Sequence, residues 1–433
     1  MIFLAAFSLS ANCTALVWDN INLLWLAVPL FLLANVLCGF WDGSAKGVRL
    51  SFCNHGAECL IIFCISAVIS SVYHIAMFAW VRGWHMILML ASAVICVLAH
   101  TVLFWNGIIC VYCTSVQLGI KHRVVGLVCG PIPVANLFAL RKIIAVTAEE
   151  VRFETEKCLL NEKRAAEKIC KTKYPVLLVH GVFFRDSKLL NYWGRVPAEL
   201  ERNGAEVYYG NHQSALSVEA SAAELAARIK EVLRESGAEK VNIIAHSKGG
   251  LDTRYAICKL GMAPYVASLT TVNTPHRGCG FADYLLEKIP ENVQKSFADK
   301  YNKAAHALGD ASPDVLAAVR DLTAQRCREL NGELEMPCGI FCASIGSVLA
   351  SPVSGKFPLN FSYPLVKYFD GTNDGLVAES SFEFGEKFTL LKAPGARGIS
   401  HGDMIDLNRE NIRGFDVREF YVGVLADLRE RGL

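Results

Sequence analysis

Charged side chains are scarce in the first 120 residues of this 433-residue chain. The six that occur there are Asp19, Asp42, Lys46, Arg49, Glu58 and Arg82. So few charges exclude an ordinary soluble domain, whose surface carries most of its Lys, Arg, Asp and Glu. No Lys or Arg precedes the first apolar run, which argues against a cleavable secretion signal. We therefore expect residues 1–147 to form an all-helical membrane domain.

Three apolar runs in this domain are long enough to cross a hydrocarbon core about 30 Å thick. They cover residues 22–41, 59–81 and 86–111. The N-terminal stretch 1–18 is apolar but short and carries four polar side chains, so it is a fourth span or a half-span. The Gly-Pro-Ile-Pro stretch at 130–133 predicts a re-entrant or interfacial segment, because it does not suit a straight span.

The charges in the predicted loops indicate an orientation. Lys46 and Arg49 lie between the first two spans, and four Lys or Arg residues follow the third span on the same side. The positive-inside rule places that side in the cytoplasm, although Arg82 lies in the opposite loop. We therefore predict an integral protein of the cell membrane whose second half is cytoplasmic.

The sequence has sixteen cysteines but no close pair with metal-ligand spacing beyond Cys338 and Cys342. Nine cysteines precede residue 130, mostly in apolar runs, and seven follow it. An odd number in the second half does not suit a disulfide framework. We expect reduced thiols, which agrees with a cytoplasmic location.

Residues 148–174 are predicted to form an amphipathic linker helix. Nine Lys or Arg and six Asp or Glu residues lie between Arg141 and Tyr174, beside a partial apolar stripe. A basic amphipathic helix favours an anionic membrane leaflet, and a solvated linker helix explains the pattern equally well. The net charge of the whole chain is only +2, and neither interpretation implies a nucleic-acid partner.

The segment 241–250, with the sequence VNIIAHSKGG, predicts a nucleophile elbow. A buried strand pattern ends at Ser247, and the small residues Ala245 and Gly249 allow the sharp bend that lifts a hydroxyl above a sheet. The next segment, 251–260, has helical periodicity. Strand, turn and helix in this order favour a nucleophilic serine over a serine in an ordinary loop.

A second buried strand pattern, 175–182, ends in His180 and Gly181. Acyl transfer needs two backbone N–H donors aimed at the developing oxyanion, and one of them usually comes from the loop after an early strand. We assign these donors to the backbones of Val182 and Lys248. His180 is predicted to be structural, because it precedes the serine.

The acid and then the base are expected to follow such a serine along the chain. We expect His276 to lie in a loop near the site and His306 on a helix surface. His401, in a loop shortly before the C-terminal helix, is the predicted base. Asp374, in a turn-rich loop, is the predicted acid, and Asp370 in the same loop is its rival.

Four motifs together resemble the bacterial triacylglycerol lipases of the α/β-hydrolase superfamily. They occupy residues 179–181, 243–250, 272–278 and 373–377. The resemblance covers about residues 175–433 and implies an α/β-hydrolase fold, in which helices flank a mostly parallel sheet. It also implies that Asp374 is the triad acid and His401 the base. A helical insertion at about 279–337 resembles the lid of these lipases, with an ordinary packing excursion as the alternative.

Many members of that family bind a structural calcium ion through two aspartates and an amide side chain. Asp403 matches one of these ligands. However, no aspartate lies between Asp321 and Asp370, and Leu407 occupies the place of the amide. A hard cation prefers several oxygen ligands, so we expect no cofactor and keep Asp403 only as a weak calcium candidate.

These observations together predict a membrane-anchored serine ester hydrolase. It is expected to cleave acylglycerols or other lipid esters through Ser247, His401, Asp374 and an acyl-enzyme, with the bilayer and a long-chain ester as its partners. A phospholipase or lipid acyltransferase with the same triad stays open. An inactive membrane interaction protein is disfavoured by the complete triad. A transporter is disfavoured because the predicted spans lack Asp, Glu and Lys, although they contain His74 and His100.

Overall fold

The structure is a computed structural model, and it describes most of the chain. The described residues are 1–12, 22–41, 43, 45–80, 84–132, 134–182, 191–307, 309–394 and 397–433. The predicted loop charge Arg82, the second proline of the 130–133 stretch and the end of the N-terminal apolar stretch lie outside them. The chain divides into two compact units, Met1–Lys163 and Arg164–Leu433, and each is described by itself.

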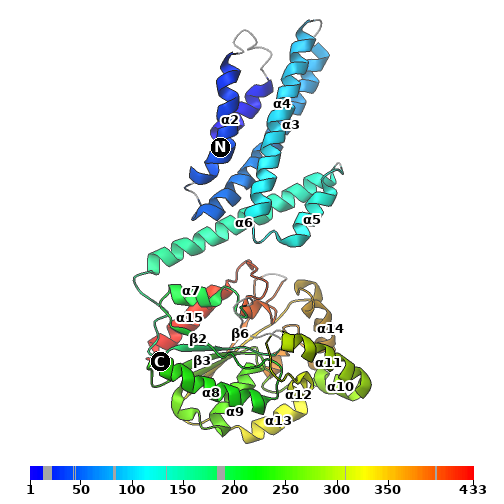
Figure 1. The fold of residues 1–433 in the computed structure, drawn as a ribbon. Helices are drawn as coiled ribbons and strands as arrows, with labels where there is room; N and C mark the ends of the chain where they lie inside the picture. Colours follow the sequence, from blue (N-terminus) through cyan, green and yellow to red (C-terminus); the bar gives the residue numbers. More distant parts are fainter. Residues whose placement is uncertain are drawn as a thin grey trace. The chain divides into compact units, whose positions relative to one another are not determined.

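The first unit is helical (Figure 1). Its described helices are α1 (Ile2–Ser10), α2 (Asn22–Trp41), α3 (Val48–Trp80), α4 (Trp84–Thr114), α5 (Gly119–Cys129) and α6 (Ala135–Arg164). Helices α3 and α4 are long and apolar enough to cross a membrane, and a shorter apolar helix covers Trp25–Leu37. Large apolar side chains such as Ile75 and Trp80 are exposed on this unit, and such surfaces mark contacts with membranes or proteins. The number of spans stays a prediction.

Two glycines allow α3 and α4 to approach closely. A Cβ added to Gly56 of α3 would lie 3.0 Å from the Gly107 carbonyl oxygen, and a Cβ added to Gly107 would lie 2.8 Å from the Leu60 side chain. Small residues at a contact between apolar helices bring their backbones close enough for van der Waals packing. The glycine pair therefore explains why these two helices pack along one another.

A buried carboxylate joins α6 to the turn after α4. Glu150 accepts hydrogen bonds from Ser115 Oγ at 2.6 Å and from the backbone N–H groups of Val116 and Gln117, both at 3.1 Å. Arg49 Nη1 lies 2.6 Å from the same carboxylate. These charge-assisted bonds compensate the cost of burying the charge. Glu150 therefore fixes α6 against the turn that leads into α5.

The second unit is built on six parallel strands in the order β2-β1-β3-β4-β5-β6. They are β1 (Val176–Val179), β2 (Val207–Tyr209), β3 (Val241–His246), β4 (Val266–Val272), β5 (Phe341–Ser347) and β6 (Lys387–Leu391). Every residue of β1, β3 and β4 is buried, in agreement with the continuous apolar run of β1 and the mainly apolar sequences of β3 and β4.

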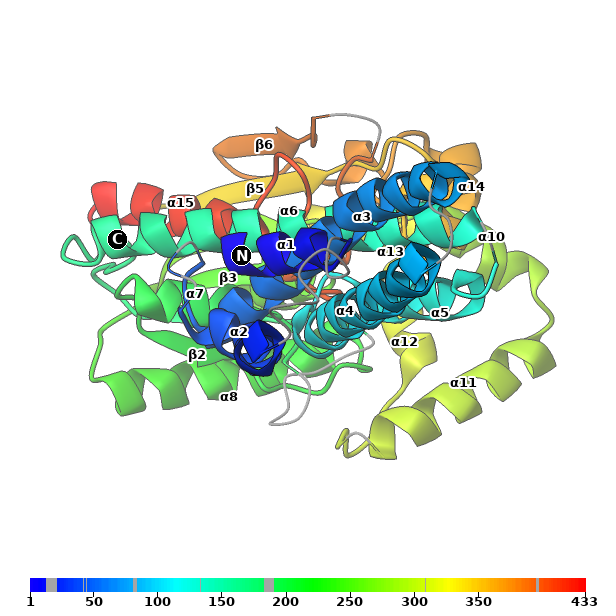
Figure 2. The same cartoon turned by 90° about the horizontal axis from the view of Figure 1, so that it is seen from above.

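Helices cover both faces of this sheet (Figures 1 and 2). Helices α8 (Val218–Ser236) and α9 (Gly249–Lys259) cover one face, and α7 (Val196–Arg202) and α15 (Val417–Glu430) cover the other. Leu177 of β1 packs in the core of the first face and its neighbour Leu178 in the core of the second, because successive strand side chains point to opposite faces. The predicted α/β-hydrolase architecture is confirmed.

A helical insertion follows β4, within the predicted lid range. It comprises α10 (Gly280–Lys288), α11 (Glu291–Ala307), α12 (Val315–Arg320) and α13 (Ala324–Glu333), and α14 (Leu359–Asp370) lies between β5 and β6. Short 3-10 helices occur at Ala263–Tyr265, Pro352–Ser354, Glu379–Ser381 and Asp403–Ile405. Side-chain caps support several helices: Ser217 caps α8, for example, and Thr323 caps α13.

The role of Glu150 yields a stability prediction. Glu150→Ala leaves the buried Ser115 hydroxyl and the N–H groups of the turn without this acceptor, which costs about 1–3 kcal/mol per buried group left unsatisfied. We expect the melting temperature of the detergent-solubilised chain, followed by thiol-dye labelling of its buried cysteines, to fall by several degrees. The neighbouring variant Glu149→Ala is the control, because it removes only an exposed pair with Arg152. Equal melting temperatures for the two variants would contradict the role given to Glu150.

Candidate active site

The predicted site residues follow strands that end at one edge of the sheet. Strand β3 pairs with β4 so that His246 lies beside Val272, and the Ser247 N–H donates to the Val272 carbonyl at 2.9 Å. Ser247 and Asn273 therefore leave the sheet side by side. In open parallel sheets the carboxyl edge is the usual location of ligand and active sites.

Ser247 has the backbone geometry that a nucleophile elbow requires. Its φ angle is +56°, in the left-handed region that non-glycine residues rarely adopt. A Cβ on Gly181 would lie 2.7 Å from Ser247 Cβ, and a Cβ on Gly249 would collide with the His180 carbonyl oxygen. Glycine at both positions therefore lets the loop after β1 approach the elbow.

The two predicted oxyanion donors lie on this loop and this elbow. Val182 is buried and lines the same cavity as Ser247. The Lys248 side chain is held in the interior instead, because its Nζ donates to Asp252 Oδ1 at 2.7 Å and to Ser221 Oγ at 2.9 Å. Burial raises the pKa of Asp252 to about 6, and the Lys248 charge opposes this shift. The pair therefore anchors the first turn of α9, directly after Ser247.

His180 is a structural residue of the loop after β1, as predicted. Its Nε2 lies 3.0 Å from the His212 carbonyl oxygen, and its ring stacks on the His212 ring with centroids 4.0 Å apart. Burial lowers the pKa of His180 to about 3, so the ring is neutral at physiological pH. A neutral stacked ring supports the loop without adding a charge beneath Ser247.

The structure brings Asp374 and His401 together. His401 Nδ1 donates to Asp374 Oδ2 at 2.6 Å, and the His401 backbone N–H donates to the Asp374 carbonyl at 2.9 Å. The other carboxylate oxygen of Asp374 accepts two backbone N–H bonds at 2.8 Å, from Leu376 and Val377. This arrangement fixes the tautomer of His401 that leaves Nε2 as a proton acceptor. Within the described residues no hydrogen bond joins Ser247 Oγ to His401, and such bonds often form only with substrate.

Asn273 is a site residue that sequence reasoning missed. Its Nδ2 donates to Asp374 Oδ2 at 2.5 Å and to Ser347 Oγ at 2.8 Å, and its φ angle is +48°. The amide therefore holds the same carboxylate oxygen that accepts the hydrogen bond from His401 Nδ1. A signal was present in the sequence, because Asn273 directly follows a predicted strand whose carboxyl end lies beside that of the serine strand.

Tyr192 and His246 were also missed. The Tyr192 hydroxyl lies 2.7 Å from His246 Nδ1 and accepts the Gly181 N–H at 3.0 Å. The His246 ring lies 4.5 Å from the His401 ring, and burial, followed by the charge of His401, lowers the pKa of His246 well below its usual range. His401 is therefore flanked by an uncharged ring. No motif in the sequence indicates Tyr192, because its contacts depend on the folded loop.

Three further candidates from the sequence do not join the pair of Asp374 and His401. His276 is buried near the site, where its Nδ1 accepts from Arg254 Nη1 at 3.2 Å and its Nε2–H donates to Thr271 Oγ1 at 3.0 Å, and burial lowers its pKa. His306 is exposed on α11. Asp370 caps α10, because its two carboxylate oxygens accept the N–H groups of the first two residues of that helix at 3.1 and 3.2 Å. In the described part of the chain, none of the three is hydrogen-bonded to Asp374 or His401.

A cavity of about 400 Å³ contains Ser247 and Val182 in its wall. Most of its remaining wall comes from the helical insertion, through side chains such as Leu286, Ile289, Phe297, Val319 and Leu322. Among its described lining residues none is charged, and Gln294 is the one polar side chain besides Ser247. The cavity therefore suits an apolar group placed next to the serine hydroxyl.

The residues around Asp403 do not fit a calcium site. Arg397 donates to both carboxylate oxygens of Asp403, at 2.8 and 3.2 Å, and the Ser400 N–H donates to one of them at 2.8 Å. Arg397 also bonds Glu410 at 2.9 Å. A guanidinium group thus already neutralises the carboxylate that a cation would need. Across the described ranges no cluster of three His, Cys, Asp or Glu side chains could hold a metal ion.

The chain is similar in sequence to a family of serine esterases and to several lipases. A family model described as "Putative serine esterase (DUF676)" matches residues 205–306. A triacylglycerol lipase from Burkholderia plantarii is 36% identical over 180 residues, which cover 39% of this chain and 49% of that protein. One from Vibrio cholerae serotype O1 is 31% identical over 239 residues, which cover 50% of this chain and 76% of that protein.

The chain spans about half the length of the first curated relatives it matches, 49% of the Burkholderia protein and 55% of a triacylglycerol lipase from Pseudarthrobacter phenanthrenivorans. Among solved structures, the lipase of Staphylococcus hyicus is 19% identical with a TM-score of 0.46, and the match covers 60% of this chain and 97% of that one.

The Asn273 contact gives a prediction for the site. Asn273→Gly keeps the positive φ angle but removes the amide that holds Asp374. A hydrogen bond to a charged group contributes about 1.5–3 kcal/mol, so labelling of Ser247 by a fluorophosphonate should slow by roughly 10- to 100-fold. Ser347→Ala is the matched control, since it removes the other partner of the same amide and should change the rate less than about threefold. An unchanged rate in Asn273→Gly would show that the contact does not position the carboxylate.

Proposed function

The chain belongs to the triacylglycerol lipase family, and from this premise we propose that it is a membrane-anchored serine hydrolase that cleaves acylglycerols or other long-chain lipid esters. Ser247 is the nucleophile, His401 the base and Asp374 the acid, and the backbones of Val182 and Lys248 hold the oxyanion. The observation that carries this proposal is an apolar cavity with Ser247 in its wall. The same unit contains the hydrogen-bonded pair of Asp374 and His401.

The reaction proceeds by acyl transfer to serine. Ser247 Oγ attacks the ester carbonyl carbon while His401 Nε2 takes its proton, and Asp374 stabilises the resulting imidazolium. The developing oxyanion accepts hydrogen bonds from the backbone N–H groups of Val182 and Lys248. His401 returns the proton to the leaving alcohol oxygen as the carbon–oxygen bond breaks. A water molecule, activated by His401, then hydrolyses the acyl-enzyme and releases the fatty acid.

The apolar cavity supports a long acyl chain as the group that is transferred. Each methylene that moves from water into an apolar site gains about 0.8 kcal/mol. The cavity wall beside the serine consists almost wholly of apolar side chains, about half of them from α10, α11 and α12. Long-chain esters therefore gain binding free energy that short esters lack.

An exposed aromatic surface supports action at a lipid interface. On and before α14, Phe357, Phe361 and Tyr368 are 81%, 72% and 83% exposed. The segment 352–369 also carries Lys356 and Lys367 but no Asp or Glu. Aromatic side chains with neighbouring lysines suit the boundary between anionic headgroups and acyl chains. This segment packs on the loop that carries Asp374, because Ser362 Oγ donates to the Gly375 carbonyl oxygen.

The helical unit supports membrane anchoring, through α3 and α4, which have the length and composition of membrane spans. The Lys and Arg residues that flank the predicted spans favour a cytoplasmic hydrolase unit by the positive-inside rule. Protease treatment of sealed vesicles tests this localisation. Cleavage of the hydrolase unit from the cytoplasmic side supports the orientation, and cleavage only from the exterior overturns it.

The central test of the function is removal of the nucleophile. Ser247→Ala should lower kcat for a long-chain p-nitrophenyl ester by about 10⁶-fold, the loss seen when such a serine is removed from a triad. Ser312→Ala, at an exposed serine in the α11–α12 loop, should keep wild-type activity. Wild-type turnover in Ser247→Ala would refute the proposal. Analysis of the products with a lipid alcohol present separates hydrolysis from acyl transfer.

The cavity also predicts chain-length selectivity. Val319→Phe adds volume to the cavity wall, so kcat/KM for a p-nitrophenyl palmitate substrate should fall about tenfold or more, while that for the butyrate ester changes less than about threefold. Ala227→Phe is the matched control, because Ala227 is exposed on α8 and lies outside the cavity. Equal losses for both esters would mean that this cavity does not bind the acyl chain.

A further inference from the structure

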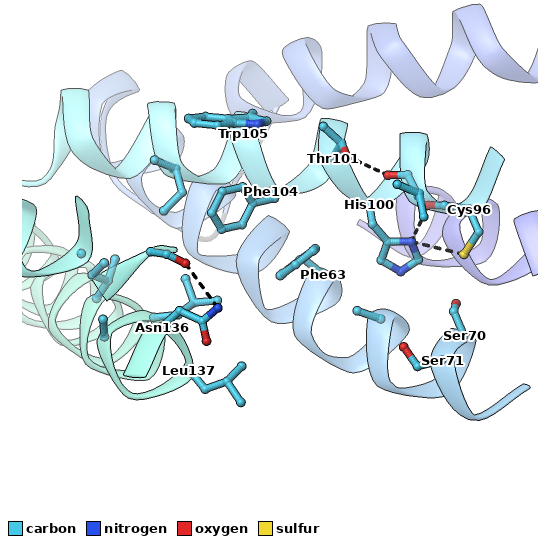
Figure 3. A pocket seen from close by; sticks show the side chains of 18 of the residues that line it. Phe63, Ser70, Ser71, Cys96, His100, Thr101, Phe104, Trp105, Asn136 and Leu137 are labelled. Carbon is cyan, nitrogen blue, oxygen red and sulfur yellow. Dashed lines mark hydrogen bonds between the residues drawn. The ribbon is translucent and has the colours of Figure 1, made fainter. Parts of the chain in front are cut away.

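The helical unit contains a second, larger cavity of about 620 Å³ (Figure 3). Residues of α3, α4, α5 and α6 line it, and its middle part is aromatic and aliphatic, with Phe63, Phe104 and Trp105. Its volume lies within the range of about 300–1,000 Å³ that is usual for small-molecule sites. The cavity is thus large enough for a lipid-sized ligand.

The lining excludes a charged ligand. Among its described lining residues none is Asp, Glu, Lys or Arg. A carboxylate, phosphate or ammonium group placed in this cavity would stay unpaired in apolar surroundings, which is strongly unfavourable. The ligand that fits is therefore apolar over most of its length and electrically neutral.

Polar side chains gather at one end of the cavity. Ser70 and Ser71 of α3 lie there opposite Cys96, His100 and Thr101 of α4 (Figure 3). His100 is already engaged, because its Nδ1 lies 2.7 Å from the Cys96 carbonyl oxygen and its Nε2 lies 2.9 Å from Ser66 Oγ. The end is therefore polar, but this histidine is occupied by protein partners.

His74 also lines the cavity, and its ring nitrogen Nε2 is a hydrogen-bond acceptor to which no described group donates. Its Nδ1 lies 2.8 Å from the Ser70 carbonyl oxygen. A carbonyl oxygen only accepts, so Nδ1 carries the hydrogen, and in the neutral ring Nε2 carries the lone pair. Nε2 is buried and has no hydrogen-bond partner within the described residues. Buried acceptors are normally paired, and a hydroxyl group of a bound molecule would satisfy this one.

We propose that this cavity binds a neutral long-chain lipid with a free hydroxyl group, of the mono- or diacylglycerol class, whose hydroxyl donates to His74 Nε2. The apolar middle of the cavity holds the acyl chain, and the polar end holds the glycerol. The choice of this lipid class rests on the proposed function, because partial acylglycerols are the products of acylglycerol hydrolysis. The helical unit is then a product site in addition to an anchor.

The test uses the full chain with Ser247→Ala in detergent micelles, so that the probe is not hydrolysed. The probe is a 1-monoacylglycerol with a photoreactive diazirine in its acyl chain, and mass spectrometry maps the crosslinked peptides. We expect crosslinks within residues 63–143, which are distinguishable from crosslinks in the hydrolase cavity. Unlabelled 1-monooleoylglycerol should compete with the probe, whereas triolein, which lacks a hydroxyl group, and oleate, which is charged, should not.

Variants on α3 separate a specific site from general lipid contact. His74→Phe removes the acceptor and Ala67→Phe fills the cavity, and each should lower the crosslinking of residues 63–143 about tenfold, as loss of one hydrogen bond or of cavity space implies. His74→Gln keeps an acceptor oxygen, and Ala76→Phe places the same ring on an exposed position of α3 outside the cavity. Both should retain crosslinking within about threefold and show that the helix bundle folds.

Unchanged crosslinking in His74→Phe and Ala67→Phe would overturn the proposed site, and so would competition by triolein as strong as that by monooleoylglycerol. Failure of the proposed function is a separate result. It would appear as wild-type turnover in Ser247→Ala or as an absence of fluorophosphonate labelling at Ser247, and neither measurement depends on crosslinking in the helical unit.

Discussion

The catalytic half of this protein depends on one strained backbone position. Ser247 adopts a φ angle of +56° at the end of β3, a conformation that costs on the order of 1–3 kcal/mol for a residue with a side chain. The Ser247 N–H bond to Val272 and the glycines at 181 and 249 stabilise it, because only glycine fits where the loop after β1 meets the elbow. This constraint places the Ser247 hydroxyl at the carboxyl edge of the sheet. The loops that carry Asp374 and His401 lie after the strands β5 and β6 of the same sheet.

Around this elbow, the charges are arranged so that only one is available to support proton transfer. Asp374 is fixed by His401, Asn273 and two backbone N–H groups, whereas Asp252 is paired with Lys248 inside α9. The neighbouring histidine rings remain uncharged because burial disfavours their protonation. In the proposed mechanism, the imidazolium formed on His401 would therefore interact mainly with the carboxylate of Asp374.

The cavities of the two units both have linings that suit long, uncharged molecules. The cavity at Ser247 is walled by apolar side chains of the insertion, and the cavity between α3 and α4 has a lining without charged residues in its described part. They differ in their polar groups, since the first offers a nucleophile and the second offers the buried acceptor of His74. The proposed substrate and the proposed ligand are therefore related lipids that differ in a free hydroxyl group.

The sequence by itself determined the α/β class, the order of strand, elbow and helix around Ser247, and the candidacy of Asp374 and His401, because local patterns and chain order encode these features. Only the tertiary structure revealed Asn273 and Tyr192, whose partners lie 101 and 54 residues away. It also showed that Arg397 donates to both carboxylate oxygens of Asp403, and that His74 lines a cavity while its buried Nε2 has no hydrogen-bond partner within the described residues. Such contacts depend on how distant segments pack, and local periodicity carries no information about them.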